Sequence, residues 1–159
     1  MLNKKRKGMV LVLGILMSLG IAPVAFAESY SAPGVNCVDS NGYIVYAGWA
    51  YNASTTADAN FQCPIIRYGL TTTDLSNLYI SMTDQHSQES VSCHVISGNL
   101  NGIGYSLSNT VSTGNSWRGT TTMNMGTVDG YSYGQAKVEC SVPDYDIDAS
   151  GIKGYRWTD

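Results

Sequence analysis

The stretch Ala136-Lys137-Val138-Glu139-Cys140-Ser141-Val142 alternates strictly between apolar and polar side chains. A period of two is the pattern of a β-strand with one buried face. The side chains expected to face the core are Ala136, Val138, Cys140 and Val142. The side chains expected to face water are Lys137, Glu139 and Ser141. The stretch therefore predicts a half-buried strand that carries a cysteine on its core side.

The same alternation recurs in short segments separated by clusters of Gly, Asn, Ser, Asp and Pro. Three segments, 60–66, 78–83 and 91–95, each present an apolar set to one side. These sets are Phe61, Cys63 and Ile65; Leu78, Ile80 and Met82; and Val91, Cys93 and Val95. Further candidate strands cover 43–47, 104–107, 118–125 and 152–157. No run of helical period is long enough to compete, so the chain is predicted to be all-β.

Turn sequences separate several of these candidate strands. Asn41-Gly42, Asn101-Gly102 and Asp129-Gly130 are dipeptides that suit tight hairpins. About eight short strands at this spacing predict a two-sheet sandwich, jelly-roll-like or immunoglobulin-like, with a small β-barrel as the alternative.

The first 27 residues have the organisation of a cleavable signal peptide. Lys4, Lys5, Arg6 and Lys7 precede an apolar run, and Ala25-Phe26-Ala27 stands directly before Glu28. This order of basic, apolar and small residues predicts cleavage after Ala27. The apolar run is shorter than the roughly 20 residues of a transmembrane helix. We therefore expect a secreted or periplasmic protein without a membrane anchor, and one domain over residues 28–159.

The expected mature chain is acidic. Four of the nine basic residues lie in the leader and all twelve acidic residues follow it, which leaves a net charge of −7. An acidic surface argues against nucleic acid and anionic membranes as partners. The 132 remaining residues suffice for one ordinary core.

Four cysteines, Cys37, Cys63, Cys93 and Cys140, follow the leader. Oxidising conditions outside the cytoplasm favour two disulfides, and the absence of a C-x-x-C pair argues against zinc. Three of the four lie on the apolar faces of candidate strands, so the bridges are expected inside the core. Of three possible pairings, we favour Cys37 with Cys63 and Cys93 with Cys140, because each joins strands that are close in chain order.

Two features resemble catalytic motifs, but each lacks the expected context. The segment 130–134 matches G-x-S-x-G around Ser132. A strand pattern follows it where a nucleophile elbow requires a helix, and both histidines precede the serine. Asp84, His86 and Glu89 share one polar loop, and His94 follows Cys93, yet nothing in the sequence would orient them for acid–base chemistry. An enzyme is therefore the less favoured class, and no catalytic residue is predicted.

Asp144, Asp146 and Asp148 alternate in a way that partly matches a calcium-binding loop. An EF-hand would require Gly at the sixth position and Glu at the twelfth, where this chain has Ala149 and Tyr155. We expect a solvated acidic turn and no cofactor, with calcium as the weaker alternative.

Four aromatic residues, Trp49, Tyr51, Trp117 and Trp157, lie near the ends of candidate strands or in loops. Exposed aromatics on a β-sandwich are candidates for stacking on sugars or gripping a protein partner. The alternative is that they fill the core or cap its ends, because tyrosine and tryptophan combine an apolar body with a polar tip.

An ordered set of motifs runs through the expected mature chain. It comprises Asn52, Cys63-Pro64-Ile65, Cys93, the run 138–143 and Gly154-Tyr155-Arg156-Trp157. The set resembles that of small secreted, four-cysteine, β-rich bacterial proteins of unknown function. The resemblance implies export, disulfides and a sandwich, and implies no catalytic residue.

Three classes of function follow from these features. The preferred hypothesis is a non-enzymatic module outside the cytoplasm that binds a glycan, a cell-surface component or a protein through exposed aromatics and loops. A self-assembling subunit of a fibre or coat is the main alternative, since few charges and open strand edges permit pairing between subunits. A small secreted hydrolase is the third class.

Overall fold

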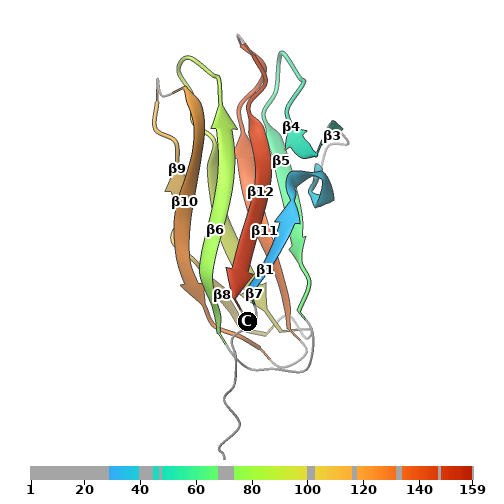
Figure 1. The fold of residues 1–159 in the computed structure, drawn as a ribbon, viewed down its shortest axis with the longest axis vertical. Helices are drawn as coiled ribbons and strands as arrows, with labels where there is room; N and C mark the ends of the chain where they lie inside the picture. Colours follow the sequence, from blue (N-terminus) through green and yellow to red (C-terminus); the bar gives the residue numbers. More distant parts are fainter. Residues whose placement is uncertain are drawn as a thin grey trace, which may run out of the picture.

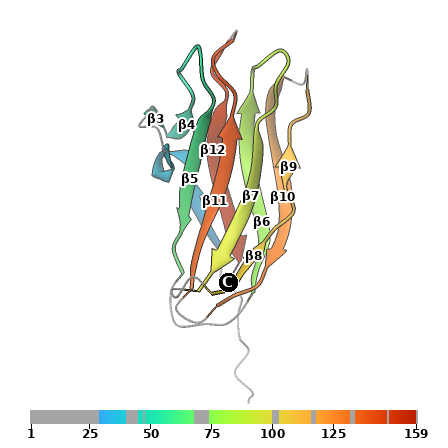
Figure 2. The ribbon, with the colours of Figure 1, turned by 180° about the vertical axis from the view of Figure 1, so that it is seen from behind.

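The computed structural model describes residues 29–39, 45–46, 48–67, 74–99, 103–115, 118–131, 134–146 and 148–158. Their strands form two six-stranded antiparallel sheets packed face to face (Figures 1 and 2). The leader, the turns Asn41-Gly42 and Asn101-Gly102, Trp117 and Ser132 lie outside the described residues. One short 3₁₀ helix, η1 (Gly34–Asn36), lies within them.

Sheet A faces the viewer in Figure 1. Its strand order is β10 (Gly119–Val128), β6 (Leu75–Asp84), β12 (Gly151–Thr158), β4 (Trp49–Tyr51) and β3 (Val45–Tyr46). Strand β1 (Ser29–Pro33) also pairs with β12. It pairs with residues 154–158 of β12, whereas β4 pairs with residues 151–152.

Sheet B faces the viewer in Figure 2. Its strand order is β2 (Val38–Asp39), β5 (Ala59–Ile65), β11 (Gln135–Val142), β7 (Ser92–Gly98) and β8 (Tyr105–Leu107). A two-residue strand, β9 (Val111–Ser112), pairs with β7 beyond β8.

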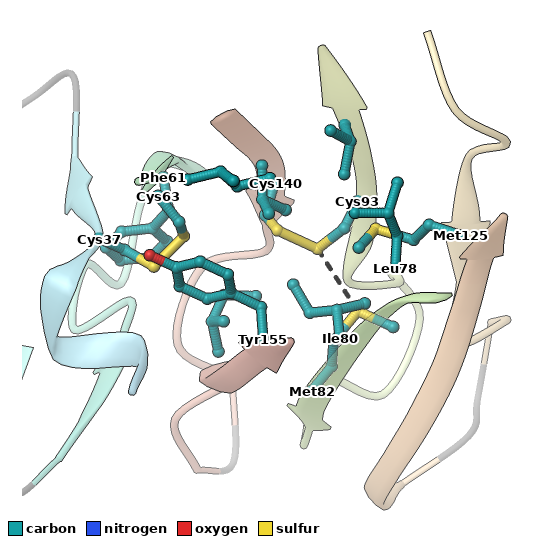
Figure 3. Packing of buried hydrophobic residues seen from close by; sticks show 14 of the residues in the cluster. Cys37, Phe61, Cys63, Leu78, Ile80, Met82, Cys93, Met125, Cys140 and Tyr155 are labelled. Atoms are coloured by element: carbon teal, nitrogen blue, oxygen red, sulfur yellow. Dashed lines mark hydrogen bonds between the residues drawn. A yellow bond between two sulfur atoms is a disulfide. The ribbon is translucent and has the colours of Figure 1, made fainter. Parts of the chain in front are cut away.

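The inward faces agree with the alternation in the sequence. The apolar sets of β5, β6, β7 and β11 are all buried, and they form one cluster between the sheets. Figure 3 shows part of this core, with Phe61, Leu78, Ile80 and Met125 directed into the space between the layers. The all-β, two-sheet prediction is confirmed, and the described strands form open sheets rather than the closed barrel of the alternative.

Both disulfide pairings are confirmed. Cys37 bonds to Cys63 and Cys93 bonds to Cys140, and all four side chains are buried (Figure 3). Each bridge lies within sheet B: Cys93 and Cys140 stand directly opposite each other on β7 and β11, and Cys37 comes just before β2, which pairs with β5. The bridges therefore join neighbouring strands of one layer and do not link the two layers.

The prediction of a hairpin at Asp129-Gly130 is wrong. These residues follow β10, which belongs to sheet A, and precede β11, which belongs to sheet B. The connection therefore crosses from one sheet to the other, and no two-residue hairpin forms. The connections from β5 to β6 and from β6 to β7 cross between the sheets in the same way. A turn dipeptide encodes a local bend and carries no information about which sheet the next strand joins.

Candidate functional site

The aromatic pair Trp49 and Tyr51 lies on the outer face of sheet A. Ala50 between them is buried, so the alternation of β4 directs the two rings away from the core. The ring centroids are 5.0 Å apart and the rings are tilted by 37°. Both side chains are half-buried, which leaves aromatic surface accessible to solvent.

A third aromatic residue on this face, Tyr79, was not among the residues singled out from the sequence. Tyr79 stands opposite Arg156 on the neighbouring strand, and the guanidinium carbon of Arg156 lies 4.3 Å from the Tyr79 ring centroid. The alternation of 78–83 already placed Tyr79 on the polar face of its strand. Its neighbour Arg156 could be found only from the pairing of β6 with β12.

A groove of about 670 Å³ crosses this face beside Tyr79 and Arg156. We call it the outer groove of sheet A. Its lining draws on β1, β6, β10 and β12 and includes Ser31, Tyr79, Ser81, Thr122, Lys153 and Gly154. Small and hydroxyl-bearing side chains therefore line a groove that has an aromatic ring and two cations at its margins.

Lys153 connects this groove to the aromatic pair. Its Nζ atom lies 5.8 Å from the Trp49 ring centroid, and the same side chain lines the groove. A register irregularity between Ile152 and Gly154 accommodates Lys153 as an extra residue on the outer face. Trp49, Tyr51, Tyr79, Lys153 and Arg156 therefore share one face of one sheet.

Trp157, the other described tryptophan, lies in the core rather than at this face. It is 4% exposed and stacks between Tyr30 and Tyr155, with centroid distances of 5.6 and 5.7 Å. Of the four aromatics selected from the sequence, the structure thus places Trp49 and Tyr51 together and Trp157 apart from them, while Trp117 lies outside the described residues. The alternation of Trp157 with Arg156 is the signal in the sequence that could have indicated the core position.

The three aspartates of the possible calcium loop are engaged by different partners. Asp144 Oδ1 lies 3.2 Å from His86 Nε2, and Asp148 Oδ1 accepts the N–H of Ala149. Asp146 Oδ2 accepts hydrogen bonds from the Ser87 hydroxyl and backbone N–H, and the hydroxyl bond is the main reason that the pKa of Asp146 lies below its usual range. Among the described residues, no three His, Cys, Asp or Glu side chains are positioned to hold a metal ion.

Asp84 and His86 are oriented, contrary to the expectation from sequence. Asp84 is fully buried, and its carboxylate accepts hydrogen bonds from Val91 N, His86 N and the hydroxyls of Thr113 and Ser150. These donors come from the segments after β6, β9 and β11. Asp84 therefore ties together the connections at one end of the sandwich, whereas Glu89 is exposed.

The imidazole of His86 is occupied at both nitrogens. Nδ1 accepts the backbone N–H groups of Gln88 and Glu89 at 3.1 and 2.8 Å, which places the ring proton on Nε2, facing Asp144. A general base needs a free lone pair within reach of its substrate. Because the only lone pair of His86 is used by the backbone, this arrangement serves to hold the loop.

The outer face of sheet B has a different character. His94, Glu139 and Lys137 form a row in which Glu139 lies 3.6 Å from His94 and 2.6 Å from Lys137. A groove of about 500 Å³ on this face is lined partly by Val38, Pro64 and Ile96. The cation Lys137 on sheet B is therefore paired with a carboxylate, and the groove on this face is lined partly by aliphatic side chains, whereas the groove on sheet A is bordered by Tyr79, Lys153 and Arg156.

Comparison with models of protein families and with curated proteins finds no match. In the part of the chain that the structure describes, no helix is long and apolar enough to span a membrane.

Proposed function

We propose that this chain is an exported, non-enzymatic module that binds a glycan in the outer groove of sheet A. The observation that carries the proposal is the composition of that face. Tyr79 lines a groove that carries hydroxyl groups, and Trp49 and Tyr51 lie on the same face, where Trp49 is linked to the groove through Lys153. Sugars present apolar C–H faces and polar hydroxyl edges, and this face offers matching aromatic surfaces and hydrogen-bonding groups.

The proposed location outside the cytoplasm rests on the leader and on the cysteines. Two buried disulfides fit an oxidising compartment, where such bonds form and persist. The polar-rich, weakly charged composition suits a protein that works among hydrated polymers.

Affinity electrophoresis of residues 28–159 in gels that contain dextran, xylan, polygalacturonate or alginate tests the proposal. We expect retardation by at least one of these polymers. Tyr79→Ala should weaken it by about tenfold or more, the effect of truncating a central aromatic anchor. The matched control is Tyr105→Ala, since Tyr105 is exposed on β8 of the other sheet.

Unchanged mobility in all four gels would refute glycan binding, as would equal effects of the two tyrosine substitutions. Thermal melts of each variant establish that the fold is intact. Trp49→Ala provides a second test on the same face if Tyr79→Ala does not fold.

A specific observation also supports the alternative of self-assembly. Ile103, Tyr105 and Leu107, at and just before edge strand β8, are 78%, 70% and 52% exposed. An apolar edge strand invites pairing with another chain. Size-exclusion chromatography over a hundredfold concentration range tests this: self-assembly predicts a growing species that Leu107→Lys abolishes, and a constant monomer excludes it.

A further inference from the structure

The charges on the outer face of sheet A are unlike those of the rest of the chain. After the leader, five basic residues stand against twelve acidic ones. Two of the five, Lys153 and Arg156, lie on this one face. Among the described strands of sheet A, Asp84 is the single acidic residue, and it is buried and faces the loop network at the end of β6. This face is therefore locally cationic on an acidic protein.

Both cations are held in place by aromatic rings rather than by carboxylates. Arg156 packs on Tyr79 and Lys153 lies near Trp49. Within the part of the chain that the structure describes, neither cation forms an ion pair. A cation–π contact uses the face of the guanidinium and leaves its N–H donors available for an anion.

The two cations border the same groove, on either side of Gly154. Gly154 has no side chain to obstruct the space between them, and a Cβ atom there would lie 3.0 Å from the Ala32 carbonyl oxygen. Ser31, Ser81 and Thr122 bring hydroxyl groups to the same lining. The groove thus offers positive charge and neutral hydrogen-bonding groups side by side.

We propose that the ligand of this groove is an anionic glycan, whose acidic group lies between Lys153 and Arg156 while neighbouring sugar units contact Tyr79 and the hydroxyl-lined surface. This inference rests on the proposed function and specifies its ligand class. Two kinds of ligand have this chemistry in common, namely a negatively charged oxygen on a sugar or polyol chain. In one the charge belongs to a uronic acid carboxylate, and in the other it belongs to a phosphodiester. A neutral glycan that covered the groove would remove Lys153 and Arg156 from water without giving either cation an anionic partner.

Calorimetric titration of residues 28–159 with three probes at 50 mM NaCl tests the inference. The probes are a galacturonic acid hexamer, the fully methyl-esterified hexamer and a glycerol phosphate oligomer. We expect the acid hexamer or the phosphate oligomer to bind at least tenfold more tightly than the ester, the loss expected when a charge-assisted hydrogen bond is removed. Raising NaCl to 300 mM should weaken binding of the anionic probe and leave any binding of the ester unchanged.

Substitution identifies the groups that recognise the anion. Arg156→Gln and Lys153→Gln should each weaken binding of the anionic probe by about tenfold. Arg156→Lys should weaken it less than Arg156→Gln, because it keeps the charge but loses the planar guanidinium that stacks on Tyr79. Lys137→Gln is the matched control, because Lys137 lies on the outer face of sheet B and pairs with Glu139. Since Lys153 and Arg156 are exposed, both glutamine variants are expected to fold, and thermal melts check this.

The outcomes separate this inference from the proposed function. Equal binding of acid and ester, or unchanged affinity of both glutamine variants, overturns the anionic ligand and leaves glycan binding standing. Binding of the phosphate oligomer without the uronate supports the inference and identifies a phosphodiester as the group. Failure of these probes together with failure of all four polysaccharides removes both proposals.

Discussion

Asn52 is a buried polar residue that holds its own loop to the end of β11. Its Nδ2 atom donates to the carbonyl oxygens of Ala57, Val142 and Pro143 at 2.9, 3.2 and 3.0 Å, and its Oδ1 accepts the N–H of Ser54. The side chain is 0% exposed. An amide is the one neutral group of this shape that donates on one side and accepts on the other.

Asn52→Asp should therefore destabilise the fold by about 3 kcal/mol, because a carboxylate oxygen would face three carbonyl oxygens with no compensating donor. Urea denaturation monitored by fluorescence measures the change. Asn36→Asp is the matched control, and since Asn36 is exposed we expect a change of no more than about 0.5 kcal/mol. Similar stabilities of the two variants would contradict the role assigned to the Asn52 amide.

Tyr155 links the two layers and has a titration that stability measurements can detect. Its hydroxyl donates to the Pro64 carbonyl oxygen at 2.6 Å, and burial raises its pKa to about 12 (Figure 3). In the unfolded chain a tyrosine ionises near pH 10. Between pH 10 and 12 the unfolded state has lost this proton and the folded state retains it, so stability should fall as the pH rises.

Tyr155→Phe removes this contribution. The free energy of unfolding of the variant should decrease less steeply between pH 10 and 12 than that of the wild type, while at pH 7 the variant should be about 1 kcal/mol less stable because it lacks the hydrogen bond. Urea titrations at pH 7, 10, 11 and 12 give both quantities. Parallel pH profiles would show that Tyr155 ionises equally easily in the folded and unfolded chains.

At the scale of elements, the disulfides stabilise sheet B. The Cys93–Cys140 bridge closes 47 residues and Cys37–Cys63 closes 26. The Cys93–Cys140 bridge lies in the core, where the sulfur atom of Met82 from the opposite sheet is 3.5 Å from the sulfur atom of Cys93 (Figure 3). Removing this bridge therefore costs packing as well as chain entropy.

We expect Cys93→Ala/Cys140→Ala to lose more stability than Cys37→Ala/Cys63→Ala. The chain-entropy model assigns about 4 kcal/mol to the longer loop and about 3.5 kcal/mol to the shorter, and the cavity at Met82 adds to the first. Equilibrium unfolding in urea compares the two pairs. The reverse order would show that the segment before β2 contributes more to stability than the centre of sheet B.

The acidic segment that follows β11 serves as a connection whose carboxylates are bound to neighbouring groups. Since Asp144, Asp146 and Asp148 have separate partners, calcium would have to displace His86 and Ser87 to gather them. We predict that calcium at millimolar concentration, compared with chelator, leaves the melting temperature unchanged. A rise of several degrees that Asp146→Asn abolishes would instead establish a calcium site, because saturation at a hundredfold excess over Kd adds about 2.7 kcal/mol.

At the scale of the whole molecule, the first strand among the described residues begins directly after the expected leader. β1 begins at Ser29, two residues beyond Ala27, and pairs along its length with the C-terminal strand β12. We predict that the exported protein begins at Glu28. Intact-mass measurement of the protein from the envelope or medium checks this, and a product that retains residues 1–27 would indicate a membrane-anchored form.

The local pattern of side chains was sufficient to predict much of the fold. Alternation identified the strands β5, β6, β7 and β11, the inward face of each and the burial of three cysteines, and candidate strands were also placed where β3, β8, β10 and β12 lie. It missed the short strands β1, β2, β4 and β9, since two to five residues are too few for a period of two to stand out. The candidate site was predicted only in part: Trp49 and Tyr51 were selected, whereas Tyr79, Lys153 and Arg156 were not.

What the sequence by itself determined is therefore which side of each strand is apolar, because the direction of a side chain in a strand depends only on the position of its residue. Only the tertiary structure decided which strands are neighbours. Tyr79 meets Arg156, and Lys153 meets Trp49, because β12 pairs with both β6 and β4, which lie far from it along the chain. Which strands become neighbours depends on how the two sheets pack their apolar faces against each other. The residues that share the outer groove of sheet A therefore come together only when both sheets have formed.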